Sequence, residues 1–160
     1  MGLTRRHDLA AGHRPGAAAL GGPGRQFPFV CAGTARGVVA AGSETIGPTP
    51  RAVLWTSPDG RTWTRSAAFA AAASAADGLS AVAADGDRIM VMGTENRRPS
   101  AYASLNGGTR WSRVGVDEGG FGLFGGRDSS AAAIRGDDVV VVGTDDNAGA
   151  VWVGRLPPRR

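Results

Sequence analysis

Three apolar runs recur along the chain at nearly constant spacing, and this repeat constrains the fold more than any other feature. The runs read GVVAAGSE, RIMVMGTE and DVVVVGTD, and each ends in glycine, then serine or threonine, then an acidic residue. Their glycines, Gly42, Gly93 and Gly143, lie fifty-one and fifty residues apart. A period of this length is typical of architectures in which each repeat is one supersecondary unit that covers its neighbour.

Each repeat reads as a series of short strands. A first apolar strand, a tight turn and the strongly apolar run are followed by a polar hairpin loop and a third strand, AVLWTS, SAYASL or GAVWVG. A fourth strand, TWTRS or RWSRV, follows in the first two repeats. Valine-rich runs bounded by Gly, Asp and Asn predict strands, and the unbroken apolar character of IMVM and VVVV predicts burial on both faces. The sequence therefore predicts an all-β fold, a partial β-propeller of about three four-stranded antiparallel blades.

The predicted blades are preceded by an Arg-, Gly- and Ala-rich leader and followed by a basic tail. The third blade lacks a fourth strand, and the leader segment GLTRR resembles TWTRS, so it could be the outer strand of a preceding blade. Between blades, AAFAAAASAAD predicts at most a short helical turn, and GGFGLFGG is expected to pack Phe121 or Phe124 inward. The predicted boundaries are 1–26 for the leader, 27–66, 79–114 and 129–154 for the blades within 27–154, and 155–160 for the tail.

Three blades are fewer than a propeller needs, because propellers typically close with four to eight. Either the chain is a fragment of a longer propeller, which is the favoured expectation, or two copies join as a homodimer into a six-bladed ring.

Two similar polar turns, SPDGRTW and SLNGGTRW, lie between the predicted third and fourth strands of the first two repeats. An Asp or Asn side chain can accept hydrogen bonds from backbone N–H groups further round such a turn, and Gly permits the positive φ at which the chain reverses. The Trp that follows is expected to pack between strands. The residues that we single out in these turns are Ser57, Asp59, Gly60, Thr62 and Trp63 in the first, and Ser104, Asn106, Gly108 and Trp111 in the second.

Both turns resemble the Asp-box, or BNR repeat, of sialidase-like β-propellers, whose pattern is S-x-D-x-G-x-T-W. The first copy is one residue shorter than the pattern, and the second has Asn106 for the Asp and Arg110 for the Thr. The resemblance covers roughly residues 27–154. It implies that the boxes lie away from the ligand face, so these residues are assigned a structural role rather than a binding role.

The catalytic set that the resemblance implies is not recognisable. Sialidases use three arginines, a Tyr–Glu nucleophile pair and an acidic acid/base, and they carry a Phe-Arg-Ile-Pro signature that this chain lacks. The only tyrosine, Tyr102, occupies the repeat position of Trp55 and Trp152, which indicates a packing role; Glu44, Glu95 and Glu118 are the glutamates that could partner it. No catalytic residue is assigned. We expect a non-catalytic binding or scaffold module of unknown ligand; a sialidase-like glycoside hydrolase and a carbohydrate-binding lectin remain the alternatives.

Composition argues against several other functions. The formal net charge is +4, but residues 26–154 hold eleven Arg against thirteen acidic residues, which disfavours a nucleic-acid binder. Cys31 is the only cysteine and is expected to be buried, and His7 and His13 lie in the leader, so no metal or cofactor is predicted. No apolar run is long enough to cross a membrane, and the leader is a poor signal peptide. The compartment is left open, since full-length relatives could be secreted, and the partner could be a protein or a glycan.

Overall fold

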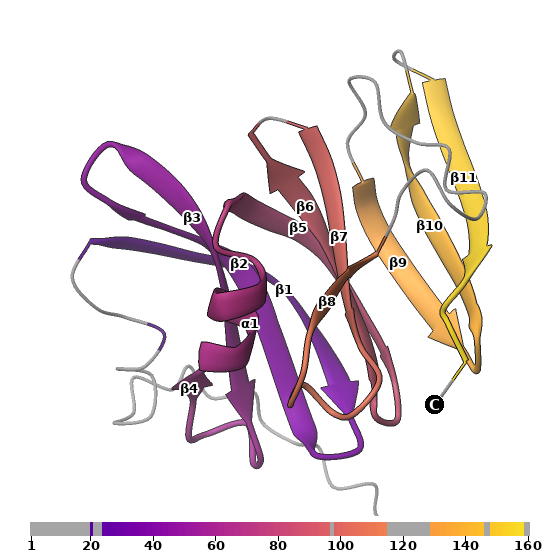
Figure 1. The fold of residues 1–160 in the computed structure, drawn as a ribbon, viewed down its shortest axis with the longest axis horizontal. Coiled ribbons are helices and arrows are strands. Elements are labelled where there is room, and N and C mark those ends of the chain that lie inside the picture. Colours follow the sequence, from indigo (N-terminus) through magenta and orange to yellow (C-terminus); the bar gives the residue numbers. More distant parts are fainter. Residues whose placement is uncertain (1–19, 21–23, 97, 115–128, 146–147, 159–160) are drawn as a thin grey trace, which may run out of the picture.

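The structure, a computed structural model, describes residues 20, 24–96, 98–114, 129–145 and 148–158. These residues form three antiparallel sheets, which pack face to face in chain order (Figure 1). The all-β prediction is confirmed. The first sheet comprises β1 (Arg25–Thr34), β2 (Gly37–Ile46), β3 (Thr49–Ser57) and β4 (Thr64–Arg65). The second comprises β5 (Ala76–Asp85), β6 (Arg88–Glu95), β7 (Arg98–Ser104) and β8 (Ser112–Val114). The third comprises β9 (Ser129–Arg135), β10 (Asp138–Asp145) and β11 (Ala148–Arg155).

Each sheet is a meander in which consecutive strands pair, and the repeat is visible in the strand register. Trp55 pairs with Ala40 in the first sheet, Tyr102 with Val91 in the second and Trp152 with Val141 in the third. The three aromatic residues therefore occupy one register position in all three sheets.

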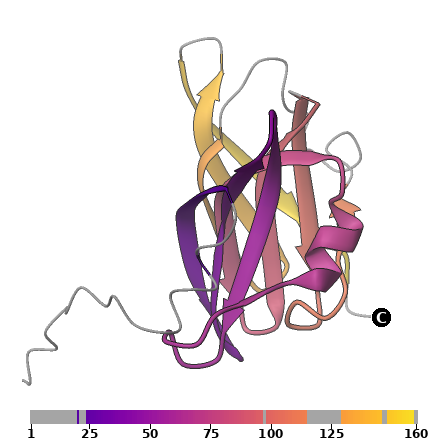
Figure 2. The same cartoon turned by 90° about the vertical axis from the view of Figure 1, so that its left-hand side faces the viewer.

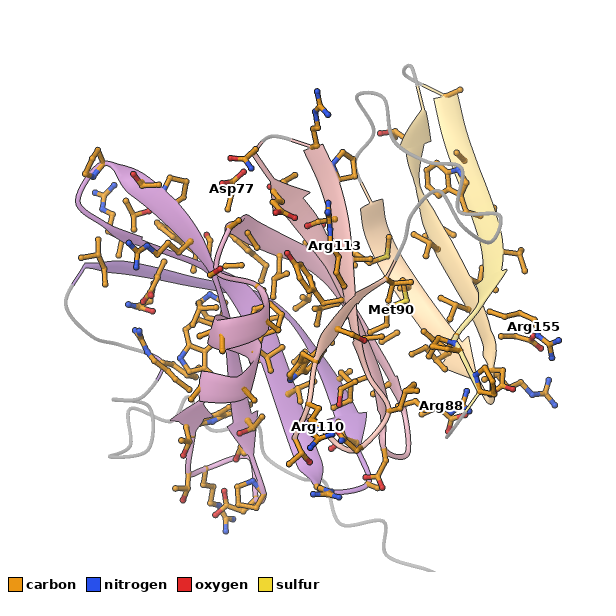
Figure 3. All side chains as sticks on the ribbon, viewed as in Figure 1. Asp77, Arg88, Met90, Arg110, Arg113 and Arg155 are labelled. Carbon is orange, nitrogen blue, oxygen red and sulfur yellow. The ribbon has the colours of Figure 1, made fainter. Side chains whose placement is uncertain are left out.

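The middle sheet is covered on both faces. Ile89 and Val91 of β6 belong to a buried apolar cluster shared with the first sheet, whereas Met90 and Met92 belong to a second cluster shared with the third sheet. Figure 3 shows Met90 in the space between β6 and the third sheet. Because successive side chains of a strand point to opposite faces, an apolar run such as IMVM fills both clusters, as predicted for this strand.

The corresponding prediction for VVVV in β10 was wrong. Val139 and Val141 are fully buried against the second sheet, but Val140 and Val142 are 38% and 40% exposed. The difference arises because no described element covers the far face of the third sheet.

One short helix interrupts the strands, in agreement with the helical turn expected there. It is α1 (Ala67–Ala72), and it lies to one side of the strands (Figures 1 and 2). Its first turn is capped by the Ser66 hydroxyl, which accepts a hydrogen bond from the Phe69 N–H at 3.2 Å. Phe69 is buried and meets the rings of Tyr102 and Trp111 edge-on at 5.7 and 5.3 Å. The helix thus closes the outer edge of the cluster between the first and second sheets.

Two further predictions, one for the leader and one for the segment between the second and third sheets, concern residues that the structure does not describe. The proposed inward packing of Phe121 or Phe124 and the proposed strand GLTRR both lie outside the described residues.

Turns at one end of the sheets are tied to each other from sheet to sheet. Arg36, in the turn between β1 and β2, contacts Asp87 in the turn between β5 and β6, with Nε 3.2 Å from Oδ1. Arg88 pairs in turn with Asp137 and donates to the Gly136 carbonyl at 3.0 Å. The Arg88 side chain is nearly buried between the second and third sheets (Figure 3). These contacts fix the relative positions of neighbouring sheets at this end.

Candidate functional site

The first polar turn is organised around the Asp59 carboxylate. Its Oδ1 accepts hydrogen bonds from the backbone N–H groups of Thr62 at 2.7 Å and Arg61 at 2.8 Å, and its Oδ2 accepts from the Thr62 hydroxyl at 3.3 Å. The Ser57 hydroxyl lies 3.2 Å from Oδ1. These donors, led by the Thr62 N–H, lower the pKa of Asp59 to about 2. The carboxylate is therefore occupied within its own turn.

The second turn uses an amide in place of the carboxylate. Asn106 Oδ1 accepts from the Arg110 N–H at 2.9 Å and from the Ser104 hydroxyl at 3.0 Å, and Ser104 Oγ accepts from the Gly108 N–H at 2.8 Å. The Trp111 indole N–H donates to the Gly108 carbonyl at 3.0 Å. Both turns thus join the third and fourth strands of their sheets through side-chain contacts to the backbone.

The difference in length between the turns is absorbed by glycine. Gly60 alone follows the Asp in the first turn, with φ of 70°, whereas Gly107 and Gly108 follow the Asn in the second, with φ of 68° and 86°. Because glycine adopts positive φ without a steric penalty, the extra residue is accommodated without disturbing the side-chain clamp.

The acids that follow the repeat glycines form ion pairs with the fourth strands. Glu44 Oε2 lies 2.7 Å from Arg65 Nη1 and accepts from the Gln26 amide at 3.1 Å. Glu95 Oε2 lies 3.2 Å from Arg113 Nη2, at the equivalent place in the second sheet (Figure 3). The pairing of Glu44 and Glu95 with these arginines was not predicted from the sequence. A signal was present, because each arginine follows a turn Trp by two residues.

The structure brings Tyr102 and Glu95 together. The Tyr102 hydroxyl donates to Glu95 Oε2 at 3.2 Å, while its ring packs against Phe69. Tyr102 is only 2% exposed. Burial raises the pKa of Tyr102, and the Glu95 charge raises it further, so the hydroxyl stays protonated at neutral pH. Of the other two glutamates, Glu44 pairs with Arg65, and Glu118 lies outside the described residues.

Three shallow grooves are among those on the surface of the described residues. One of about 340 Å³ lies between Arg36, Pro58 and the second turn, and one of about 540 Å³ lies between the second turn and the C-terminal prolines. A third, of about 320 Å³, lies beside Phe29 and Leu79. Their size is in the range of small-ligand sites, but their linings contain no carboxylate, so none holds an acid/base pair.

The part of the chain that the structure describes contains no cluster of three or more His, Cys, Asp or Glu side chains that could hold a metal ion. Among its helical residues, none belong to a helix with the length and apolar character needed to cross a membrane.

Cys31 is exposed, so the prediction that it is buried was wrong. It lies on the face of the first sheet that points away from the second sheet. The residue fifty-one positions later, Val82, is buried between the first and second sheets. Cys31 is uncovered because no described sheet precedes the first one.

Two outer faces therefore end the stack. We call the far side of the first sheet the first outer face; it includes Cys31, Ala40, Val53 and Trp55, of which the last three contact Leu20 and Trp63. We call the far side of the third sheet the third outer face. Its exposed apolar residues are Ala131, Ala133, Val140, Val142, Val151 and Val153.

Comparisons with protein-family models, with curated proteins and with solved structures found no match. The described residues offer two structural turns, two repeated ion pairs and two apolar faces.

Proposed function

We propose that this chain is a non-catalytic β-propeller module of the Asp-box type, which acts as a binding or scaffold domain. The observation that carries this proposal is the repetition of one turn clamp, Asp59 in the first sheet and Asn106 in the second, at the same point of consecutive four-stranded meanders. Meanders stacked face to face at a fixed repeat are the construction principle of propeller blades.

The placement of the ionisable side chains supports a non-catalytic role. Asp59 is held by backbone donors of its turn, and Glu44 and Glu95 are paired with arginines of the fourth strands. An acid/base catalyst has to reach the reacting atoms of a substrate in an accessible site. These carboxylates instead connect strands and turns to each other.

Incubation with a fluorogenic sialoside and a panel of other fluorogenic glycosides tests the proposal. We expect no turnover above that of heat-denatured protein. Turnover that copurifies with the folded chain through successive columns would contradict the non-catalytic role.

A sialidase-like hydrolase is the second candidate, because the hydrogen bond from Tyr102 to Glu95 matches the nucleophile pair that the family resemblance implies. Against it stand the burial of Tyr102 and its raised pKa. If any turnover is found, Tyr102→Phe distinguishes the cases. Loss of turnover in a variant with an unchanged circular dichroism spectrum would favour the hydrolase.

A carbohydrate-binding lectin is the remaining alternative, and the ligand of the proposed module could be a glycan or a protein. The repeated aromatic residues Trp55 and Tyr102 are buried, so they are not available to stack on sugars. A glycan-array screen at physiological salt decides this point, and reproducible binding to one glycan class would identify a lectin.

A further inference from the structure

The third outer face has the same composition and register as two faces that are buried inside the stack. Val142 pairs with Val151 across β10 and β11. The equivalent pairs are Ala41 with Leu54 in the first sheet and Met92 with Ala101 in the second. Those four side chains are at most 2% exposed, because the next sheet covers them, whereas Val142 and Val151 are 40% and 66% exposed. The third outer face therefore has the repeat positions that form one half of each inter-sheet contact within the chain.

The first outer face has the repeat positions that form the other half of such a contact. Cys31 corresponds to Val82, and Trp55 corresponds to Tyr102; Val82 and Tyr102 lie in the cluster that receives the preceding sheet. The chain thus carries both types of surface, one at each end of its stack. The third outer face is exposed, whereas among the residues named for the first outer face only Cys31 is exposed: Ala40, Val53 and Trp55 are 6%, 7% and 0% exposed in the single chain, where Leu20 and Trp63 pack against them.

We propose that a second copy of this chain covers both outer faces, with the third sheet of each copy packed on the first sheet of the other. Two such head-to-tail contacts close a ring of six sheets, a number within the range in which propellers close. Leu20 contacts part of the first outer face, and the sheet of the partner replaces it there. This inference rests on the propeller arrangement proposed above.

Burial of these side chains supplies the driving force. A contiguous row of exposed valines and alanines is unusual on a soluble monomer, and its removal from water is favourable in proportion to the area buried. The first outer face of a second copy suits the third outer face, because side chains at the same repeat positions make the contacts between neighbouring sheets within the chain.

Light scattering coupled to size-exclusion chromatography is the first test. We expect one monodisperse species of twice 16.2 kDa. Val142→Arg and Cys31→Arg should each give a monomer, because each variant spoils both contacts of its own dimer. The control Ala71→Arg, at an exposed position of α1, should leave the dimer unchanged.

A mixture of Val142→Arg and Cys31→Arg separates this arrangement from other dimers. The mixed pair retains one contact with two unaltered faces, so mixing the two monomers should restore a dimer. A wild-type monomer, an open series of larger species, or a Cys31→Arg variant that stays dimeric would overturn the proposal.

Cross-linking keeps the test valid if the arginine variants fail to fold. Val140→Cys, Val142→Cys and Val151→Cys each place a second thiol on the third outer face, opposite Cys31 of the other copy. A short bismaleimide should link at least one of them into a covalent dimer, whereas wild-type chain and Ala71→Cys should remain unlinked. Absence of linkage in all three variants would overturn the ring. A monomer without glycosidase turnover contradicts the ring alone, and turnover by a dimer contradicts the non-catalytic function alone.

Discussion

At the scale of single residues, the glycines that end the first two apolar runs, Gly42 and Gly93, are a steric requirement. The first strand of each meander has a bulge or register shift opposite the glycine that ends the apolar run. A Cβ atom at Gly42 would lie 1.9 Å from the Phe27 carbonyl oxygen, and one at Gly93 would lie 1.9 Å from the Gly78 carbonyl oxygen. Glycine occupies this position of the repeat because the backbone of the first strand approaches the second strand closely there.

Gly93→Ala should consequently lower the free energy of unfolding by about 2 kcal/mol or more, because the new methyl group meets backbone rather than a movable side chain. Gly149→Ala is the matched control, since a Cβ there has no heavy atom within 4 Å, and it should change stability by no more than about 0.5 kcal/mol. Urea unfolding followed by tryptophan fluorescence measures both. Equal effects would show that the close approach does not constrain Gly93.

Asp59 makes the first turn sensitive to pH in a defined window. Its pKa is lowered to about 2 in the folded chain, below the ordinary value of an aspartate, so the unfolded chain binds the proton more readily. The stabilisation is complete above about pH 5 and is lost as the pH falls toward 2. The difference in stability between wild type and Asp59→Asn should therefore shrink on acidification.

Asn106 provides the control for this titration, because an amide has no acidic proton to gain in this range. The stability difference between wild type and Asn106→Ala should stay constant from pH 5 to pH 2, measured by urea unfolding at each pH. A constant difference for Asp59→Asn as well would contradict the role given to its carboxylate.

At the scale of elements, the fourth strand of each complete meander is short and is held by charge as well as by backbone pairing. β4 has two residues and β8 has three, and each carries the arginine that reaches the repeat glutamate. The Glu44 side chain is 11% exposed and that of Arg65 is 38% exposed, so this pair is partly shielded from water. Removal of one partner leaves a mostly buried charge with fewer donors.

Arg65→Gln should lower stability by about 1–3 kcal/mol, because Glu44 keeps only the Gln26 amide, and the double variant Glu44→Gln/Arg65→Gln should recover part of this loss. The control Arg155→Gln removes a pair with Asp138 that is mostly exposed and should cost at most about 1 kcal/mol. Urea unfolding of wild type, Glu44→Gln, Arg65→Gln and the double variant completes the double-mutant cycle. Additive single effects would show that the two side chains do not interact.

Elements were predictable from the sequence to the extent that they depend on local pattern. The strands, the short helix over Ala67–Ala72 and the two turns follow from periodicity, glycine placement and Asx chemistry. The partners of Glu44 and Glu95 were not predicted, because a cross-strand ion pair depends on register and not on the composition of either strand. The exposure of Cys31 and of Val140 was mispredicted because it depends on whether another sheet lies beside theirs.

At the scale of the whole molecule, the three sheets differ in how much of their surface is covered. The second sheet has a neighbour on each face, and β6 has apolar side chains buried on both. β10 pairs with β9 and β11 as regularly as β6 pairs with its own neighbours, yet one of its faces is exposed. Strand pairing is thus comparable along the stack, and we expect the protection of those hydrogen bonds from local opening to differ.

Hydrogen exchange should reveal this difference and its dependence on self-association. If a second copy covers the third outer face, the backbone amides of Val140 and Val142 should exchange more slowly as the chain concentration rises, because opening then requires dissociation. The amides of Met90 and Met92, which are covered within the chain, should exchange at a rate set by local opening and much less by concentration. Mass spectrometry of peptides from β6 and β10, at concentrations below and above the dimerisation midpoint, measures both. Protection of β10 that is independent of concentration would mean that its outer face is not covered by another copy.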